Sequence, residues 1–181
     1  MKRKKLFHPV VFNEKEWAQA YYKRNEKNIK RVGKRFTKIL KEKGFKSGKI
    51  LDVGCGFASV PVEIAKEFPD TKIIGIDLGT PLLDIGNDII IENKLDDRIS
   101  LMKGNAMDIK FNDNTFDLVI NTFLLHIVDD PNKMLNEIER ICKPEGIIMI
   151  TDLRRGFLAN FIKKLRTSHN MKEAGNIIEK S

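Results

Sequence analysis

The sequence predicts an α/β protein built on a doubly wound, mainly parallel sheet. Three observations support this fold class. Short apolar runs recur along residues 49–152, helical patterns separate most of them, and polar or turn-forming residues follow each run. Because the runs are apolar on both faces, they have the pattern of central parallel strands, which need crossover connections to join them.

Apolar periodicity and capping residues place each element in order. Residues 14–43 carry apolar side chains at helical spacing, with Gly33 as a candidate break. Pro81 is expected to begin one helix and Asp130 to cap another. Strands are expected at residues 49–53, 72–77, 99–103, 116–121 and 146–152. Further helices are expected at residues 59–68, 81–93, 131–141, 157–165 and 171–179.

Composition limits the class of protein. The 181 residues, 41% of them hydrophobic, are enough for one domain with its own core. No apolar stretch is long enough to span a bilayer, and no signal-peptide region follows the basic residues 1–5. Cys55 and Cys142 lack metal-type spacing. We therefore expect a reduced, cytoplasmic protein without a metal site, with a basic, helical segment at residues 1–46 and one α/β domain at 47–181.

Charge is unevenly distributed along the chain. Residues 1–50 contain 17 Lys/Arg and 4 Asp/Glu, residues 51–153 contain 9 and 19, and residues 154–181 contain 7 and 2. A basic end can hold the phosphates of nucleic acid. A solvated lysine-rich surface is the stronger interpretation, because lysine outnumbers arginine 24 to 9 and no recognisable nucleic-acid module is present. Nucleic acid is therefore a secondary candidate partner, and no membrane partner is expected.

Glycines and acids that follow the first two strands predict a ligand site. Gly54 and Gly56 form a tight turn between a strand and a helix, where a ligand can lie against bare backbone and the helix N-terminus. Asp77 ends the next strand, 21 residues after Gly56. A carboxylate at that place can accept hydrogen bonds from ribose hydroxyls. The pattern therefore predicts a ligand that contains a nucleoside.

The same region discriminates between two nucleoside cofactors. A dinucleotide fingerprint requires a third glycine three residues after the second, but Ser59 stands there. Asp52, just before the glycines, would face the negative charge of a pyrophosphate. It suits a ligand with an ammonium group, and S-adenosylmethionine carries an ammonium, a ribose and no phosphate. An NAD-linked oxidoreductase is accordingly the weaker interpretation.

Six motifs resemble, in order, those of the class I S-adenosylmethionine-dependent methyltransferases, most closely the type 11 subgroup. They stand at residues 51–56 (LDVGCG), 75–78 (GIDL), 104–111 (GNAMDIKF), 113–119 (DNTFDLV), 125–131 (LHIVDDP) and 137–146 (EIERICKPEG). The resemblance covers about residues 49–153 and implies a Rossmann-like fold, S-adenosylmethionine as cofactor and S-adenosylhomocysteine as product. The cofactor-binding residues that it implies are Asp52, Gly54, Cys55, Gly56, Phe57, Asp77, Leu78, Asn105, Ala106 and Asn121.

The resemblance also implies roles for these residues. Asp77 would hold the ribose and Asp52 would lie near the amino-acid end of the donor. Asn105 and Ala106 would border the adenine, with Leu78 and Phe57 adding apolar surface. Asn105 stands where the family often has aspartate, and its amide can still meet the adenine ring.

Two departures affect the glycine loop. Phe57 is bulkier than the family's usual residue, and Ala58 stands where a further glycine is common. Ala58 is acceptable if the helix has already begun at that position. The helix that precedes the loop carries an aromatic group, which is expected either to cover the cofactor or to be buried on the domain; its members are Trp17, Tyr21 and Tyr22.

His126 is the single candidate for a catalytic base in the motif region, with local packing or capping as its alternative role. Methyl transfer from a sulfonium chiefly needs positioning and desolvation, so a base is required only if the acceptor must lose a proton. The leading function is a methyltransferase with a small-molecule acceptor. The alternatives are an RNA or protein methyltransferase that uses the basic ends, and a cofactor-binding protein or partner subunit without catalysis.

The end of the chain predicts an incomplete sheet. The resembled family adds two strands after the fifth, but no strand-like run follows Asp152. We therefore expect five strands in the order 3-2-1-4-5, a C-terminally short domain, and an apolar edge at residues 147–151. Such an edge invites pairing with another chain. A tail helix, a second copy in a homodimer, or the remainder of a longer protein would cover it.

Overall fold

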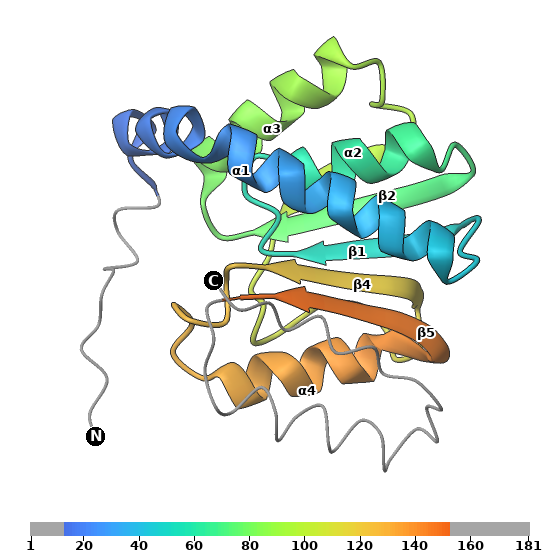
Figure 1. Cartoon of the computed structure of the whole chain (residues 1–181). Coiled ribbons are helices and arrows are strands. Elements are labelled where there is room, and N and C mark those ends of the chain that lie inside the picture. The colour runs from blue at the N-terminus through green and yellow to red at the C-terminus, as the bar shows by residue number, and fades with distance from the viewer. Residues whose placement is uncertain (1–12, 153–181) are drawn as a thin grey trace.

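A parallel sheet forms the centre of the structure (Figure 1). The computed structural model describes residues 13–152, and within them five strands pair in the order β3-β2-β1-β4-β5. All four strand pairs are parallel. The expected doubly wound fold and strand order are therefore confirmed for this part of the chain. The predicted helices at 157–165 and 171–179, and with them the question of further strands, lie outside the described residues.

The elements alternate as their periodicity predicts. The strands are β1 (Gly48–Val53), β2 (Thr71–Asp77), β3 (Ile99–Lys103), β4 (Phe116–Thr122) and β5 (Cys142–Thr151). The helices are α1 (Lys15–Glu42), α2 (Ser59–Glu67), α3 (Thr80–Glu92) and α4 (Pro131–Ile141). The expected Asp130 cap is present, because its carboxylate accepts a hydrogen bond from the Lys133 backbone N–H at 3.0 Å.

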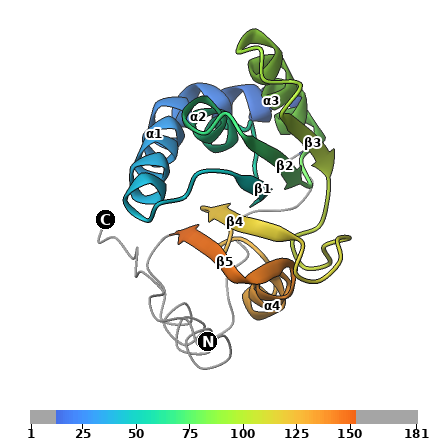
Figure 2. The same ribbon diagram turned by 90° about the vertical axis from the view of Figure 1, so that its right-hand side faces the viewer.

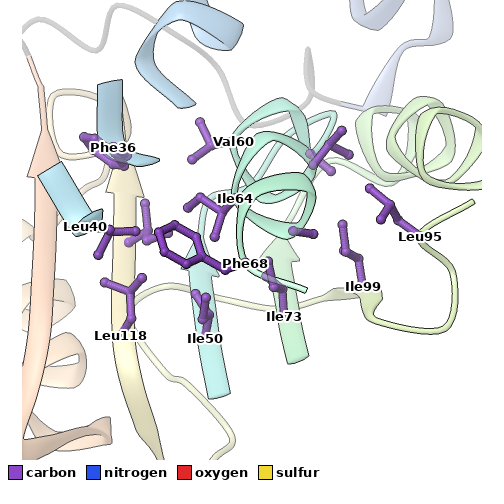
Figure 3. Close-up of a cluster of buried hydrophobic side chains, with 14 of the residues drawn as sticks. Phe36, Leu40, Ile50, Val60, Ile64, Phe68, Ile73, Leu95, Ile99 and Leu118 are labelled. Carbon is purple, nitrogen blue, oxygen red and sulfur yellow. The ribbon is translucent and has the colours of Figure 1, made fainter. Parts of the chain in front are cut away.

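Helices cover both faces of the sheet, with α1, α2 and α3 on one side and α4 on the other (Figures 1 and 2). Side chains that alternate along each strand supply the two cores. Ile50 and Leu118 pack beneath α1 and α2, whereas Leu51 and Val119 pack against α4. Figure 3 shows the first core, where side chains of α1 and α2 meet those of β1, β2 and β4.

β5 begins earlier than expected. The strand was expected to start at residue 146, but its first residue is Cys142, which pairs with Phe116. The register then shifts, so that Leu118 pairs with Ile147. The extra residues on β5 interrupt the register between these two pairs, and such an irregularity has no signature in a pattern of apolar residues.

α1 belongs to the same core as the sheet, because its Phe36 and Leu40 are buried among residues of α2, β1 and β4. The predicted boundary at residue 46 stays a prediction. Among residues 13–152, no helix has both the length and the apolar character that a membrane crossing needs.

The candidate break of α1 at Gly33 is absent. The helix runs without interruption for 28 residues, and Gly33 is buried where α1 crosses α2. A Cβ atom at Gly33 would lie 2.9 Å from the Glu63 Cβ and 3.3 Å from the Val60 Cα. Glycine stands here because two helix backbones approach closely, which a single sequence cannot distinguish from a helix break.

We expect Gly33→Val to lower the free energy of unfolding by about 1–3 kcal/mol, because the added methyl groups force α1 away from α2. The matched control is Lys34→Val, the same change to valine at the neighbouring exposed position. It costs only the helix propensity, about 0.5 kcal/mol. Urea unfolding measures both. Equal losses in the two variants would contradict the close helix contact.

Candidate cofactor-binding site

The site lies where the strand order reverses. The chain leaves β1 for α2 on one face and leaves β4 for α4 on the other, although β1 and β4 are neighbours. In open α/β sheets such a reversal is where ligands bind, in a crevice at the carboxyl ends of the strands. Figure 1 shows the arrowheads of β1, β4 and β5 at this one edge. All the polar groups described next follow or end a strand here.

The glycine loop after β1 is held against the end of β2. The backbone N–H groups of Gly54 and Cys55 both donate to the Ile76 carbonyl, at 2.8 Å and 3.1 Å. Gly54 and Gly56 have φ values of +77° and +51°, in the region that favours glycine. Apart from its two chain neighbours, no described residue has an atom within 4 Å of the position that a Cβ would take at Gly56. The loop therefore presents open backbone beside the crevice.

The helix that follows this loop begins one residue after Ala58. An alanine was expected to be acceptable at this position only if the helix had already begun there, and this condition does not hold. α2 starts at Ser59, and Ala58 has a φ of +58°, in the left-handed region. This conformation costs an alanine about 1 kcal/mol. The Ala58 methyl is fully buried in the core beneath α1, which offsets the cost.

Asp77 connects the loop to the next helix. Its Oδ2 accepts a hydrogen bond from the Gly56 N–H at 2.9 Å, and its Oδ1 accepts one from the Gly79 N–H at 2.8 Å. Burial raises the pKa of Asp77, and these backbone hydrogen bonds work in the opposite direction. Each carboxylate oxygen has a second lone pair, so the group can still accept hydrogen bonds from ligand hydroxyls.

Buried acceptors without donors lie on the two central strands. Asp52 of β1 and Asn121 of β4 are fully buried. Both carboxylate oxygens of Asp52, and the Oδ1 of Asn121, have no hydrogen-bond partner among the described residues. The Nδ2 of Asn121 donates to the Val53 carbonyl at 2.7 Å, which orients its amide. Burial, and to a lesser extent the charge of Asp77, raise the pKa of Asp52 to about 8. Buried acceptors of this kind call for a donor from outside the chain.

The side chains of Cys55 and Phe57 turn away from the open side of the loop. The Phe57 ring meets Tyr21 and Tyr22 of α1 edge-on, with ring centroids 6.0 Å and 5.1 Å apart. Cys55 is buried against Gly75, and burial raises the pKa of its thiol well above the usual value. Cys55 is thus a small, buried residue in a tight loop. Contact of either residue with a cofactor, through backbone or side chain, stays a prediction.

The aromatic group of α1 lies over this loop. Tyr21 stacks on Trp17 with a centroid distance of 5.0 Å, and these rings pack with Phe57, Leu82 and Ile85. Burial and the nearby charge of Asp77 raise the pKa of Tyr21. α1 therefore places apolar and phenolic groups beside the Asp77 carboxylate.

The loops after β2 and β3 provide the expected adenine residues. The Gly104 N–H donates to the Asp77 carbonyl at 3.0 Å, which joins the two loops. Asn105 is exposed, and its Oδ1 accepts a hydrogen bond from the Met107 N–H at 2.9 Å. Ala106 is buried, and Leu78 is 50% exposed although it is large and apolar. These residues follow the same edge of the sheet, and their contact with adenine stays a prediction.

His126 and Asp152 form a second polar pair, of which sequence reasoning identified only the histidine. The Nδ1 of His126 lies 2.8 Å from the Oδ1 of Asp152. Asp152 directly follows β5, and His126 lies in the loop after β4. Sequence reasoning found the histidine and missed the acid. The available signal was a polar residue directly after an apolar strand, the same rule that identified Asp77. No group of three or more His, Cys, Asp or Glu side chains suited to a metal ion occurs in residues 13–152.

Comparison with known proteins identifies the family. The methyltransferase domain family matches residues 51–150. The chain belongs to this family. The match confirms the resemblance to class I S-adenosylmethionine-dependent methyltransferases, and S-adenosylmethionine is the cofactor of this family. The demethylmenaquinone methyltransferase of Symbiobacterium thermophilum is 36% identical over 115 residues, which are 63% of this chain and 45% of that protein. The chain spans about half the length, or less, of the curated relatives that it matches.

Solved structures confirm the fold. A proposed S-adenosylmethionine-dependent methyltransferase of Methanococcus maripaludis superimposes with a TM-score of 0.72 and 24% identity, over 94% of this chain and 73% of that one. The [4+2]-cyclase SpnF superimposes with a TM-score of 0.64 and 25% identity, over 74% and 56% of the two chains. Because one neighbour is named a cyclase, the fold does not by itself determine the reaction.

Asp52 should make stability depend on pH. Its pKa is about 8 in the folded protein and about 4 in an unfolded chain. Between these values the unfolded state has lost the proton that the folded state keeps, so stability falls as pH rises. We expect the unfolding free energy of the wild type, relative to Asp52→Asn, to fall by up to about 1.4 kcal/mol per pH unit across this window. Urea unfolding at several pH values measures it.

The matched control is Asp84→Asn, the same acid-to-amide change at an exposed position of α3. Parallel stability curves for the wild type and Asp52→Asn would show that Asp52 ionises normally in the folded protein.

Proposed function

We propose that this protein transfers a methyl group from S-adenosylmethionine to a small-molecule acceptor. The observation that carries the proposal is the acidic character of the crevice. The open glycine loop is held by Asp77, and the unpartnered carboxylate of Asp52 lies on the adjacent strand. Two acidic side chains with acceptor oxygens to spare fit a ligand that brings hydroxyl and ammonium donors, because an ammonium beside Asp52 favours its ionised form.

Each residue of the site has a role in this proposal. Asp77 accepts hydrogen bonds from the ribose hydroxyls, and its own bonds to the loop keep it in place. Asp52 and Asn121 offer their buried oxygens to the ammonium group. The backbone from Gly54 to Phe57 lies along the ligand, and the adenine is bordered by Leu78, Asn105 and Ala106.

The chemistry divides between cofactor and protein. The cofactor supplies a methyl group already activated by a sulfonium, which leaves as a neutral thioether. The chain therefore needs to hold the donor, align the acceptor and keep water out. The aromatic group of α1, packed on Phe57, supports the last of these tasks because it covers the glycine loop with apolar surface.

A small-molecule acceptor is supported by the relatives, which are named for demethylmenaquinone. One observation favours nucleic acid as a second candidate. The solvent-facing side of α1 is strongly basic, with exposed Lys15, Lys23, Arg24, Lys27, Lys30, Arg31, Lys34, Lys38 and Lys41. Binding of RNA by this face would weaken steeply with added salt. No comparable feature of residues 13–152 favours a protein acceptor.

The acceptor class can be identified by labelling. The purified chain is incubated with methyl-labelled S-adenosylmethionine and cell extract, and the small-molecule, RNA and protein fractions are counted separately. We expect label in the small-molecule fraction. Label confined to RNA or protein would contradict the proposed acceptor. Binding of S-adenosylhomocysteine without label in any fraction would show a cofactor-binding protein without catalysis.

Donor binding can be tested at Asp77. Asp77→Ala should weaken S-adenosylhomocysteine binding by about 1.5–3 kcal/mol, roughly tenfold to a hundredfold in Kd, because charge-assisted hydrogen bonds are lost. Asp84→Ala, an exposed acid of α3, is the control and should leave Kd unchanged. Calorimetry measures both variants. Unchanged affinity in Asp77→Ala would refute the assignment of this carboxylate.

A further inference from the structure

The pair formed by His126 and Asp152 lies on the side of the crevice away from Asp77. β2, which ends in Asp77, is on one side of β1, whereas β4 and β5 are on the other. His126 follows β4 and Asp152 follows β5. Leu124, two residues before His126, closely approaches the glycine loop, because a Cβ at Gly54 would lie 2.6 Å from the Leu124 Cδ2. The pair is therefore close to the loop but outside the predicted nucleoside subsite.

The side chains of Asp152 and His126 differ in their exposure to solvent. The Asp152 side chain is 2% exposed, whereas the His126 side chain is 19% exposed. The carboxylate thus lies behind the imidazole. Because a carboxylate oxygen without a proton only accepts hydrogen bonds, the 2.8 Å contact between Nδ1 and Oδ1 favours the tautomer in which Nδ1 is the donor. In the neutral ring this leaves the lone pair on Nε2.

We infer that His126 accepts a proton from a hydroxyl group of the methyl acceptor, and that Asp152 is a positioning residue that holds the ring with Nε2 free. The inference rests on the proposed methyltransferase function and narrows it to acceptors that carry a hydroxyl group. It applies the same geometric logic by which a buried acid orients a histidine base in other enzymes.

The proton and electrons balance in this step. The acceptor hydroxyl gives its proton to Nε2 of His126, and the electron pair set free on the acceptor forms the new bond to the methyl carbon. The carbon–sulfur bond breaks, and its electron pair stays on sulfur. Asp152 stabilises the positive charge on the imidazole until the proton passes to water. No other reactant is needed.

A structural role for the pair is the competing explanation, since the contact also ties the loop after β4 to the end of β5. His126→Asn separates the two roles. The Asn amide N–H₂ can replace Nδ1 as donor to Asp152, but the variant has no group in place of Nε2. The control is Lys133→Asn on the exposed side of α4.

The first measurement uses the free protein. Nitrogen-15 NMR of the imidazole near neutral pH should show the proton on Nδ1 in the wild type and a mixture of tautomers in Asp152→Asn. A wild-type ring protonated at Nε2, or a tautomer that does not respond to Asp152→Asn, overturns the inference. This result does not depend on whether methyl transfer has been detected.

The second measurement uses methyl-labelled S-adenosylmethionine with the small-molecule fraction of cell extract. We expect His126→Asn to lower the rate of label transfer by about 100-fold or more, while the Kd for S-adenosylhomocysteine stays within about threefold. Added imidazole should restore part of the rate in His126→Ala. A His126→Asn variant as fast as Lys133→Asn overturns the inference and leaves the proposed function intact. A wild type that labels no fraction refutes the proposed function and, with it, the inference that rests on it.

Discussion

The end of β2 holds the glycine loop that ends β1, and the rest of the site depends on this attachment. The Ile76 carbonyl accepts hydrogen bonds from two loop N–H groups, and the Asp77 carboxylate accepts one from the loop and one from the start of α3. Four backbone donors thus converge on two adjacent residues. These hydrogen bonds hold the loop, with its left-handed turns, and the residue that precedes α3 against the end of β2. The ribose-binding candidate is therefore also the residue that shapes the site.

The buried acidic side chains of the site lower the stability of the folded protein. Asp52 and Asp77 lie on neighbouring strands near a buried thiol, and burial raises the pKa of each. A carboxylate with no partner is costly in a core, so Asp52 keeps its proton up to a pH of about 8. Such conflicts are expected where a site is prepared for a charged ligand rather than for stability. An ammonium group at Asp52 would remove the conflict, which couples ligand binding to stability.

α1 combines three tasks on three parts of its surface. Its buried face packs on α2, at a separation that Gly33 makes small. Its first turns place an aromatic group over the glycine loop. Its outer face carries the basic residues that give the N-terminal part of the chain its positive charge. Positive charge is therefore concentrated on the outer face of α1, whereas the predicted binding site contains acidic side chains. The two features need separate explanations.

The sequence alone determined the fold class, the strand order and the motif that surrounds Gly54, Gly56 and Asp77. These depend on local patterns: alternation or continuity of apolar residues, glycine in tight turns, and acids at strand ends. Tertiary structure decided what depends on residues distant in the chain. Gly33 resembles a helix break until Glu63 and Val60 lie against it, and the cost of the left-handed backbone at Ala58 is offset by the burial of its methyl group. A role for Asp152 is evident only from the structure, which places its carboxylate beside His126, 26 residues away in sequence. Periodicity describes which face a residue occupies, whereas the identity of its neighbour depends on how the sheet brings separate loops together.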